Sequence, residues 1–90
     1  MKPYILIVED EAPIQDLLAY NLESAGFEVA QAHDGEDALV AIAERMPDLV
    51  ILDWMLPHLS GIEVCRRLRR RPATQRLPII ILTARAEEPD

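Results

Sequence analysis

The sequence has 90 residues, half of them hydrophobic, and a formal net charge of −7. This length accommodates one small folded domain, and the negative charge disfavours nucleic acid or an anionic membrane as a direct partner. The single cysteine, Cys65, excludes an internal disulfide, and His33 and His58 have no metal-ligand spacing with it. We find no signal-peptide pattern and no apolar segment near the roughly 18 residues that span a membrane, so we expect a cytoplasmic protein without membrane contact.

The first predicted element is a strand over residues 4–8, a continuous apolar run that ends in Glu9 and Asp10. A helix is expected next, because Pro13 suits a first helical turn and Gly26 suits a helix end. Apolar residues recur between them at helical spacing: Ile14, Leu17, Leu18, Leu22 and Ala25.

Residues 27–31 alternate between apolar and polar, which predicts a less buried strand near the edge of a sheet. Residues 33–35 have turn composition. A second helix is expected to follow and to end before Pro47, with one apolar side. That side carries Ala38, Leu39 and Ile42.

Residues 49–53 carry four apolar side chains directly into Asp53, a pattern typical of a central strand in a parallel sheet. Ser60 is a candidate N-cap for a third helix, which ends at residues 71–72. One face of that helix carries Val64, Cys65 and Leu68, so we expect Cys65 to be a buried thiol. Residues 78–82 form a further apolar run and predict a fourth strand, which leads into Thr83 and Ala84.

Arginines gather in and after the third helix, at positions 66, 67, 69, 70, 71 and 76. They fit a solvated helix end, where cations also complement the helix dipole. A docking patch for an acidic partner is the alternative interpretation.

Strands and helices alternate throughout, which predicts a parallel sheet with right-handed crossovers and helices on both faces. All strand ends then lie at one edge, and the strand order 2-1-3-4 makes the first and third strands neighbours. That order brings Asp10 close to Asp53, with Glu9 at the rim, acting through water.

Three crowded carboxylates repel one another, so either one is protonated or a divalent cation lies among them. Ligands that are all oxygen favour Mg²⁺ or Mn²⁺. With Thr83 as a hydroxyl donor to an anion, this layout suits phosphoryl transfer to Asp53. The alternative interpretation is that each polar residue only caps or solvates a loop.

These motifs together resemble the receiver domain of two-component response regulators. They are Glu9-Asp10, Asp53 with Met55-Leu56-Pro57 and Ser60-Gly61, and Thr83-Ala84. Three longer stretches resemble the PhoB-like, phosphate-regulon type of transcriptional regulator. They are residues 8–14, 53–57 and 82–85.

The resemblance implies a flavodoxin-like (CheY-like) doubly wound fold. It also implies that a sensor histidine kinase phosphorylates Asp53, and that Asp10 and Asp53 coordinate Mg²⁺. Glu9 would act through water and Met55 through its carbonyl. Thr83 would be the switch hydroxyl, and the N–H groups of Trp54 and Ala84 would reach the phosphoryl group.

The family pattern continues beyond the features found in this sequence. A fifth strand and the last helices, the lysine that pairs with the phosphoryl group, the dimerisation face and the DNA-binding output domain have no counterpart in residues 1–90. We therefore expect these residues to be the N-terminal portion of a receiver domain. Homodimerisation would belong to the whole receiver, and DNA binding to the output domain.

Two other functions remain open at this point. The first is a metal-dependent phosphohydrolase with an aspartate nucleophile, of the haloacid-dehalogenase type. Such enzymes carry a second aspartate two residues after the nucleophile, where this sequence has Met55. The second is an interaction module that keeps the fold without the chemistry.

Overall fold

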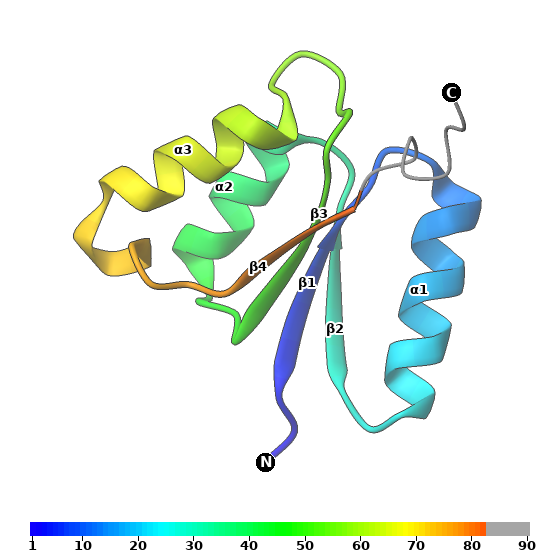
Figure 1. Cartoon of the computed structure of the whole chain (residues 1–90). Helices are drawn as coiled ribbons and strands as arrows, with labels where there is room; N and C mark the ends of the chain where they lie inside the picture. The colour runs from blue at the N-terminus through cyan, green and yellow to red at the C-terminus, as the bar shows by residue number, and fades with distance from the viewer. Residues whose placement is uncertain (83–90) are drawn as a thin grey trace, which may run out of the picture.

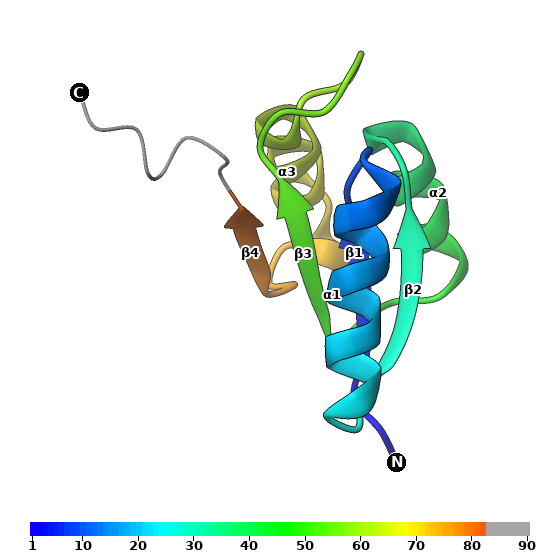
Figure 2. The same cartoon turned by 90° about the vertical axis from the view of Figure 1, so that its right-hand side faces the viewer.

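The computed structural model describes residues 1–82, in which strands and helices alternate. The strands are β1 (Tyr4–Val8), β2 (Glu28–Ala32), β3 (Leu49–Asp53) and β4 (Ile79–Leu82). The helices are α1 (Ala12–Ser24), α2 (Gly35–Glu44) and α3 (Gly61–Arg70), with the 3-10 turn η1 at Pro72–Thr74. All strand pairs are parallel, in the order β2-β1-β3-β4. Helix α1 covers one face of the sheet and α2 and α3 cover the other (Figure 1, Figure 2), which confirms the predicted fold.

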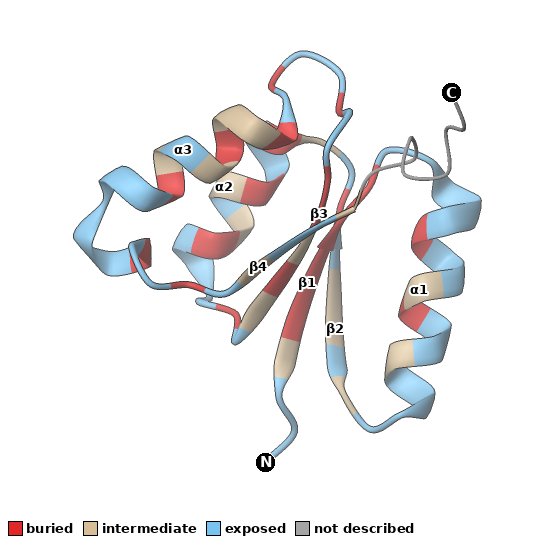
Figure 3. Ribbon diagram, in the orientation of Figure 1, coloured by how far each residue is buried: buried red, intermediate tan, exposed pale blue. Residues whose placement is uncertain are grey.

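The two faces of the sheet carry separate hydrophobic clusters. In β1, Leu6 and Val8 belong to the larger cluster, which includes residues of α2 and α3, whereas Ile5 and Ile7 belong to the smaller cluster on the α1 side. This division follows from the alternation of side chains along a strand. Figure 3 shows buried residues concentrated in the central strands and on the inner sides of the helices. The central strands are apolar throughout because helices cover both faces.

Helix ends follow the predicted chemistry. The Ser60 hydroxyl accepts a hydrogen bond from the Glu63 N–H at 3.2 Å, as expected of an N-cap. Asp34 plays the same role for α2, because its carboxylate accepts from the Asp37 N–H at 2.8 Å. Gly26 follows α1 with φ of 100°, a conformation that favours glycine.

The buried stripe of α1 differs from the predicted one. Ile14 and Leu17 are 41% and 62% exposed, whereas Gln15 and Ala19 are buried. The core-facing positions are therefore 15, 18, 19 and 22, which are spaced i, i+3, i+4 and i+7. A polar residue can occupy this stripe because the Gln15 amide finds main-chain carbonyl partners beneath the helix.

Smaller differences concern strand ends and Cys65. Strand β2 begins one residue later than predicted, because the Phe27 N–H donates to the Leu22 carbonyl at the end of α1. Strand β4 begins after Pro78, which has no N–H to donate, although its carbonyl accepts from Val50. Cys65 is half-buried and packs against the larger cluster.

The arginines at the end of α3 are partly explained by local contacts. Arg66 and Arg67 pair with Glu63 at 3.5 and 3.3 Å. Arg69 donates to three carbonyls of the following turn, including that of Leu77 at 2.8 Å. These contacts fit the interpretation of a helix end rather than a docking patch.

No helix within residues 1–82 has both the length and the apolar character to cross a membrane.

Candidate functional site

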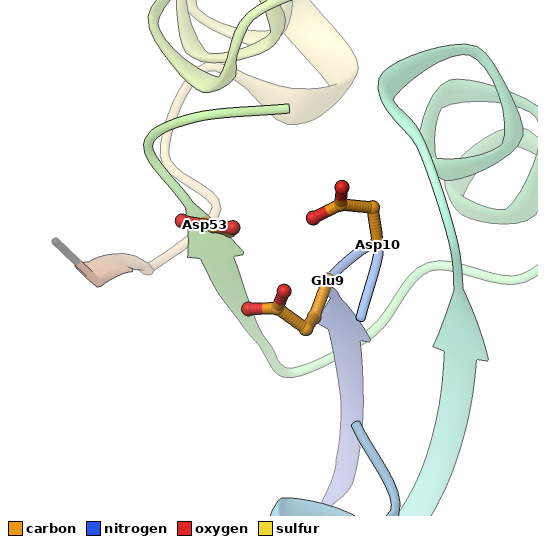
Figure 4. A group of neighbouring side chains, drawn as sticks. All are labelled: Glu9, Asp10 and Asp53. Carbon is orange, nitrogen blue, oxygen red and sulfur yellow. The ribbon is translucent and has the colours of Figure 1, made fainter. Parts of the chain in front are cut away.

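Three carboxylates meet where β1 and β3 end. Leu52 pairs with Val8 in the β1–β3 register, so Asp53 and Glu9 leave the sheet at the same level, and Asp10 follows. One carboxylate oxygen from each residue lies within 4.8 Å of the others. Figure 4 shows the carboxylates of Glu9 and Asp10 at the end of β1 and that of Asp53 at the end of β3. The predicted convergence of these three residues is confirmed.

Their burial differs from the prediction. Glu9 is 4% exposed and Asp53 is 9% exposed, whereas Asp10 is exposed. The prediction that Glu9 lies at the rim of the site is therefore wrong. Its carboxylate is held inward because the Glu11 N–H, at the turn into α1, donates to Glu9 Oε2 at 3.1 Å. The exposed member of the cluster is Asp10.

Burial raises the pKa of Glu9 from an ordinary 4.5 to about 7. The hydrogen bond from the Glu11 N–H opposes this increase, whereas the negative charges of Asp53 and Asp10 add to it. Glu9 therefore holds a proton more readily than an ordinary glutamate does. This behaviour agrees with the expectation that crowded carboxylates need a proton or a cation among them.

The loop after β3 orients Asp53. The Met55 N–H donates to Asp53 Oδ1 at 3.2 Å. The Trp54 N–H donates to the Leu82 carbonyl at 2.9 Å, which continues the β3–β4 ladder by one residue. In this conformation the Trp54 N–H is therefore engaged by the sheet. Among residues 1–82, no donor is hydrogen-bonded to the other carboxylate oxygen, Asp53 Oδ2.

Helix α3 begins so close to this loop that only glycine fits at its first residue. A Cβ at Gly61 would collide with the Asp53 carbonyl oxygen and lie 3.1 Å from Trp54 Cα. The Gly61 N–H also donates to the Trp54 carbonyl at 3.1 Å. The start of α3 thus supports the backbone that presents the Asp53 carboxylate.

The other predicted site residues are placed as follows. Met55 and Trp54 are 53% and 45% exposed beside Asp53. Thr83 and Ala84 lie outside the described residues. Sequence reasoning missed Gln15, whose buried amide contacts the carbonyl of Glu9. No local signal in the sequence indicates this contact, because positions 14, 17, 18 and 22 also fit a helical stripe.

The site offers oxygen ligands from three carboxylates, which is the donor set that Mg²⁺ and Mn²⁺ prefer. Because Asp10 is exposed, solvent water can reach this edge of the cluster. The donor set and the crowding of like charges therefore fit a divalent cation.

Comparison with known proteins agrees with this geometry. Residues 5–90 match the model of the response regulator receiver domain. The phosphate regulon transcriptional regulatory protein PhoB of Rhizobium meliloti is 61% identical over 88 residues, covering 98% of this chain and 39% of the relative. The alkaline phosphatase synthesis transcriptional regulatory protein PhoP of Bacillus subtilis is 50% identical and covers 100% of this chain and 37% of the relative. The chain thus spans about two-fifths of the length of these relatives.

A solved structure gives the same result. The N-terminal domain of a response regulator receiver protein from Methanoculleus marisnigri superposes with a TM-score of 0.88 at 38% identity, covering 90% of this chain and 66% of that one. The parallel sheet, the acidic cluster at its edge and the match over residues 5–90 point to the same assignment. The chain belongs to the family of response regulator receiver domains.

Proposed function

We propose that this chain is the phosphoacceptor part of a two-component regulator and that Asp53 accepts the phosphoryl group. The observation that carries the proposal is the convergence of Glu9, Asp10 and Asp53 at one sheet edge. Asp53 is the acceptor because it ends a central strand and its carboxylate is oriented by the Met55 N–H.

In this proposal, Asp53 Oδ2 attacks the phosphorus of a phosphohistidine on a sensor histidine kinase. The O–P bond forms as the P–N bond breaks, and the released imidazole nitrogen takes a proton from solvent. The Met55 N–H holds the other carboxylate oxygen and so fixes the direction of attack.

A divalent cation, Mg²⁺ or Mn²⁺, would be held by Asp10, Asp53 and the Met55 carbonyl, with Glu9 acting through water. When bound, it supplies the positive charge that offsets the charge developing on the phosphoryl oxygens. Glu9 would be ionised with the cation bound, because a carboxylate accepts hydrogen bonds from a metal-bound water and is favoured by the nearby positive charge. Thr83 and Ala84 would then hold the phosphoryl group.

The relatives suggest the biological setting. PhoB is named as a regulator of the phosphate regulon, and its identity of 61% supports a similar role in transcriptional control. We assign residues 1–90 to the N-terminal portion of the receiver domain. In the whole protein, a complete receiver would form a homodimer and a separate output domain would bind DNA.

The test is labelling with a small phosphodonor such as acetyl phosphate in the presence of Mg²⁺, read by intact mass. The wild-type chain should gain one phosphoryl group that hydroxylamine removes, as expected of an acyl phosphate. Asp53→Asn should not be labelled. Asp16→Asn is the matched control, because Asp16 is an exposed aspartate on α1, and it should label normally. Label that persists in Asp53→Asn would show that another residue is the acceptor.

A further inference from the structure

We propose that Gln15 is a positioning residue for the metal-binding acids: its side-chain amide fixes the main chain of Glu9 and thereby sets where Glu9 and Asp10 stand relative to Asp53. This inference rests on the proposed function, since it concerns the same site. Gln15 does not touch the three carboxylates. Its effect would pass through the backbone.

The Gln15 side chain is fully buried beneath α1. Its Nε2 lies 2.8 Å from the carbonyl oxygen of Ala32, 3.1 Å from that of Glu9 and 3.3 Å from that of Ile7. One amide group therefore connects the ends of β1 and β2 with α1. Because an amide has two N–H donors for these three acceptors, at least one N–H is shared.

The position of these carbonyls explains why the donor is needed. Val8 and Ala32 are the last pair in the β1–β2 register, and the Glu9 N–H still donates to the Ala32 carbonyl at 3.1 Å. Strand β2 then ends, so it offers the Glu9 carbonyl no further strand N–H. A buried carbonyl requires a donor, and Gln15 supplies one. The amide thus determines how the chain leaves the sheet at the first acidic residue.

Gln15 also holds the other end of the acidic segment. Its main-chain N–H donates to the Glu11 carbonyl at 3.0 Å, and the Glu11 N–H donates to Glu9 Oε2. Residues 9–11 are therefore fixed at Glu9 by the side chain of Gln15 and at Glu11 by its backbone. Asp10 lies between these two attachments and has its direction set by both.

Filling the space beneath α1 would not by itself require an amide. Gln15 Oε1 is buried and has no hydrogen-bond partner among residues 1–82. An unpartnered buried oxygen is unfavourable, and an apolar side chain of the same length would fill the space without it. The N–H donors therefore account for an amide at this position.

The experiment compares Gln15→Met with wild type by Mg²⁺ titration of Trp54 fluorescence in the full chain. Trp54 is the single tryptophan of the sequence and adjoins Asp53. Methionine has a similar length and no N–H donor. We expect a folded variant, by circular dichroism, whose dissociation constant for Mg²⁺ is about tenfold higher, as for other residues that orient metal ligands.

Leu22→Ala is the matched control. Leu22 lies on the same stripe of α1 and packs against the smaller cluster, so its truncation loosens the helix but leaves the Gln15 amide in place. We expect this variant to lose thermal stability and to keep the wild-type affinity for Mg²⁺. A loss of affinity in Leu22→Ala as large as in Gln15→Met would mean that any loosening of α1 weakens the site, and would overturn the inference.

Unchanged affinity in Gln15→Met would overturn it as well. If that variant does not fold, Gln15→Asn provides the test, because it keeps the donors on a shorter side chain that cannot reach all three carbonyls. It should bind Mg²⁺ more weakly than wild type, and wild-type affinity would overturn the inference. If the wild-type chain itself gives no Mg²⁺ response, the proposed function fails instead, which separates the two failures.

Discussion

The raised pKa of Glu9 predicts an unusual dependence of stability on pH. In the folded chain Glu9 keeps its proton up to about pH 7, whereas in the unfolded chain it ionises from its ordinary 4.5. Between these values the folded state binds more protons than the unfolded state, so stability falls as pH rises. The stability that the protonated Glu9 contributes is complete below the pKa of Glu9 in the unfolded chain. It is lost as pH rises through the pKa of Glu9 in the folded chain. At about 1.4 kcal/mol per pH unit, the interval from 4.5 to about 7 amounts to about 3.5 kcal/mol.

The assay is urea unfolding followed by circular dichroism, with EDTA present, from about pH 5 to about pH 8. Glu9→Gln keeps a neutral side chain at every pH, so the difference in unfolding free energy between wild type and this variant should change by about 2.5 kcal/mol across the series, because part of the effect falls below about pH 5. Glu11→Gln is the control, because it removes an exposed carboxylate two residues away and should leave the wild-type profile in place. Parallel profiles for wild type and Glu9→Gln would refute the reasoning.

The same proton should be linked to metal binding. Because the cation displaces it, the affinity of the wild-type chain for Mg²⁺ should decrease below about pH 7, by at most about tenfold per pH unit. Glu9→Gln should bind more weakly and should lose this part of the pH dependence. A wild-type affinity that does not change between about pH 5 and about pH 8 would show that Glu9 is already ionised.

Two further predictions concern packing. Gly61→Ala should destabilise the fold by about 1–3 kcal/mol in urea unfolding and weaken Mg²⁺ binding, because the added Cβ meets the Asp53 carbonyl. Gly26→Ala is the control: the added Cβ has open space around it but is strained at φ of 100°, so this variant should lose stability and keep its affinity for Mg²⁺. Thr74→Val should cost about 1–2 kcal/mol in the same assay, because the buried hydroxyl donates to the Leu68 carbonyl at 2.6 Å, and Thr74→Ser should retain most of the stability. Equal losses in Thr74→Val and Thr74→Ser would mean that the methyl group matters more than the hydrogen bond.

Much of the fold could be predicted because apolar runs directly define the central strands. Residues 4–8 and 49–53 form β1 and β3 as predicted, since short apolar runs of this kind suit a strand covered on both faces. The pairing of β1 with β3 then placed Asp53 beside Glu9 and Asp10, as expected for the edge of a parallel sheet.

The burial of individual side chains at the site could not be predicted in this way. Glu9 was expected at the rim, but the turn into α1 brings the Glu11 N–H back onto its carboxylate and draws it inward. Gln15 was overlooked because residues at 14, 17, 18 and 22 also fit a helical stripe. The choice between stripes one residue apart depends on carbonyl acceptors from two distant strands, and no local pattern contains that information.

The order of strands also bears on how the chain folds. About half of the sequence separates Asp10 from Asp53, although their strands are neighbours. Pairing of β1 with β2 closes a shorter loop than pairing of β1 with β3. Contacts between residues that lie far apart in the sequence form more slowly than local ones. The acidic site can therefore assemble only after the longer loop has closed. In refolding with Mg²⁺ present, the delay before Trp54 responds would measure how long the chain takes to place its third strand beside its first.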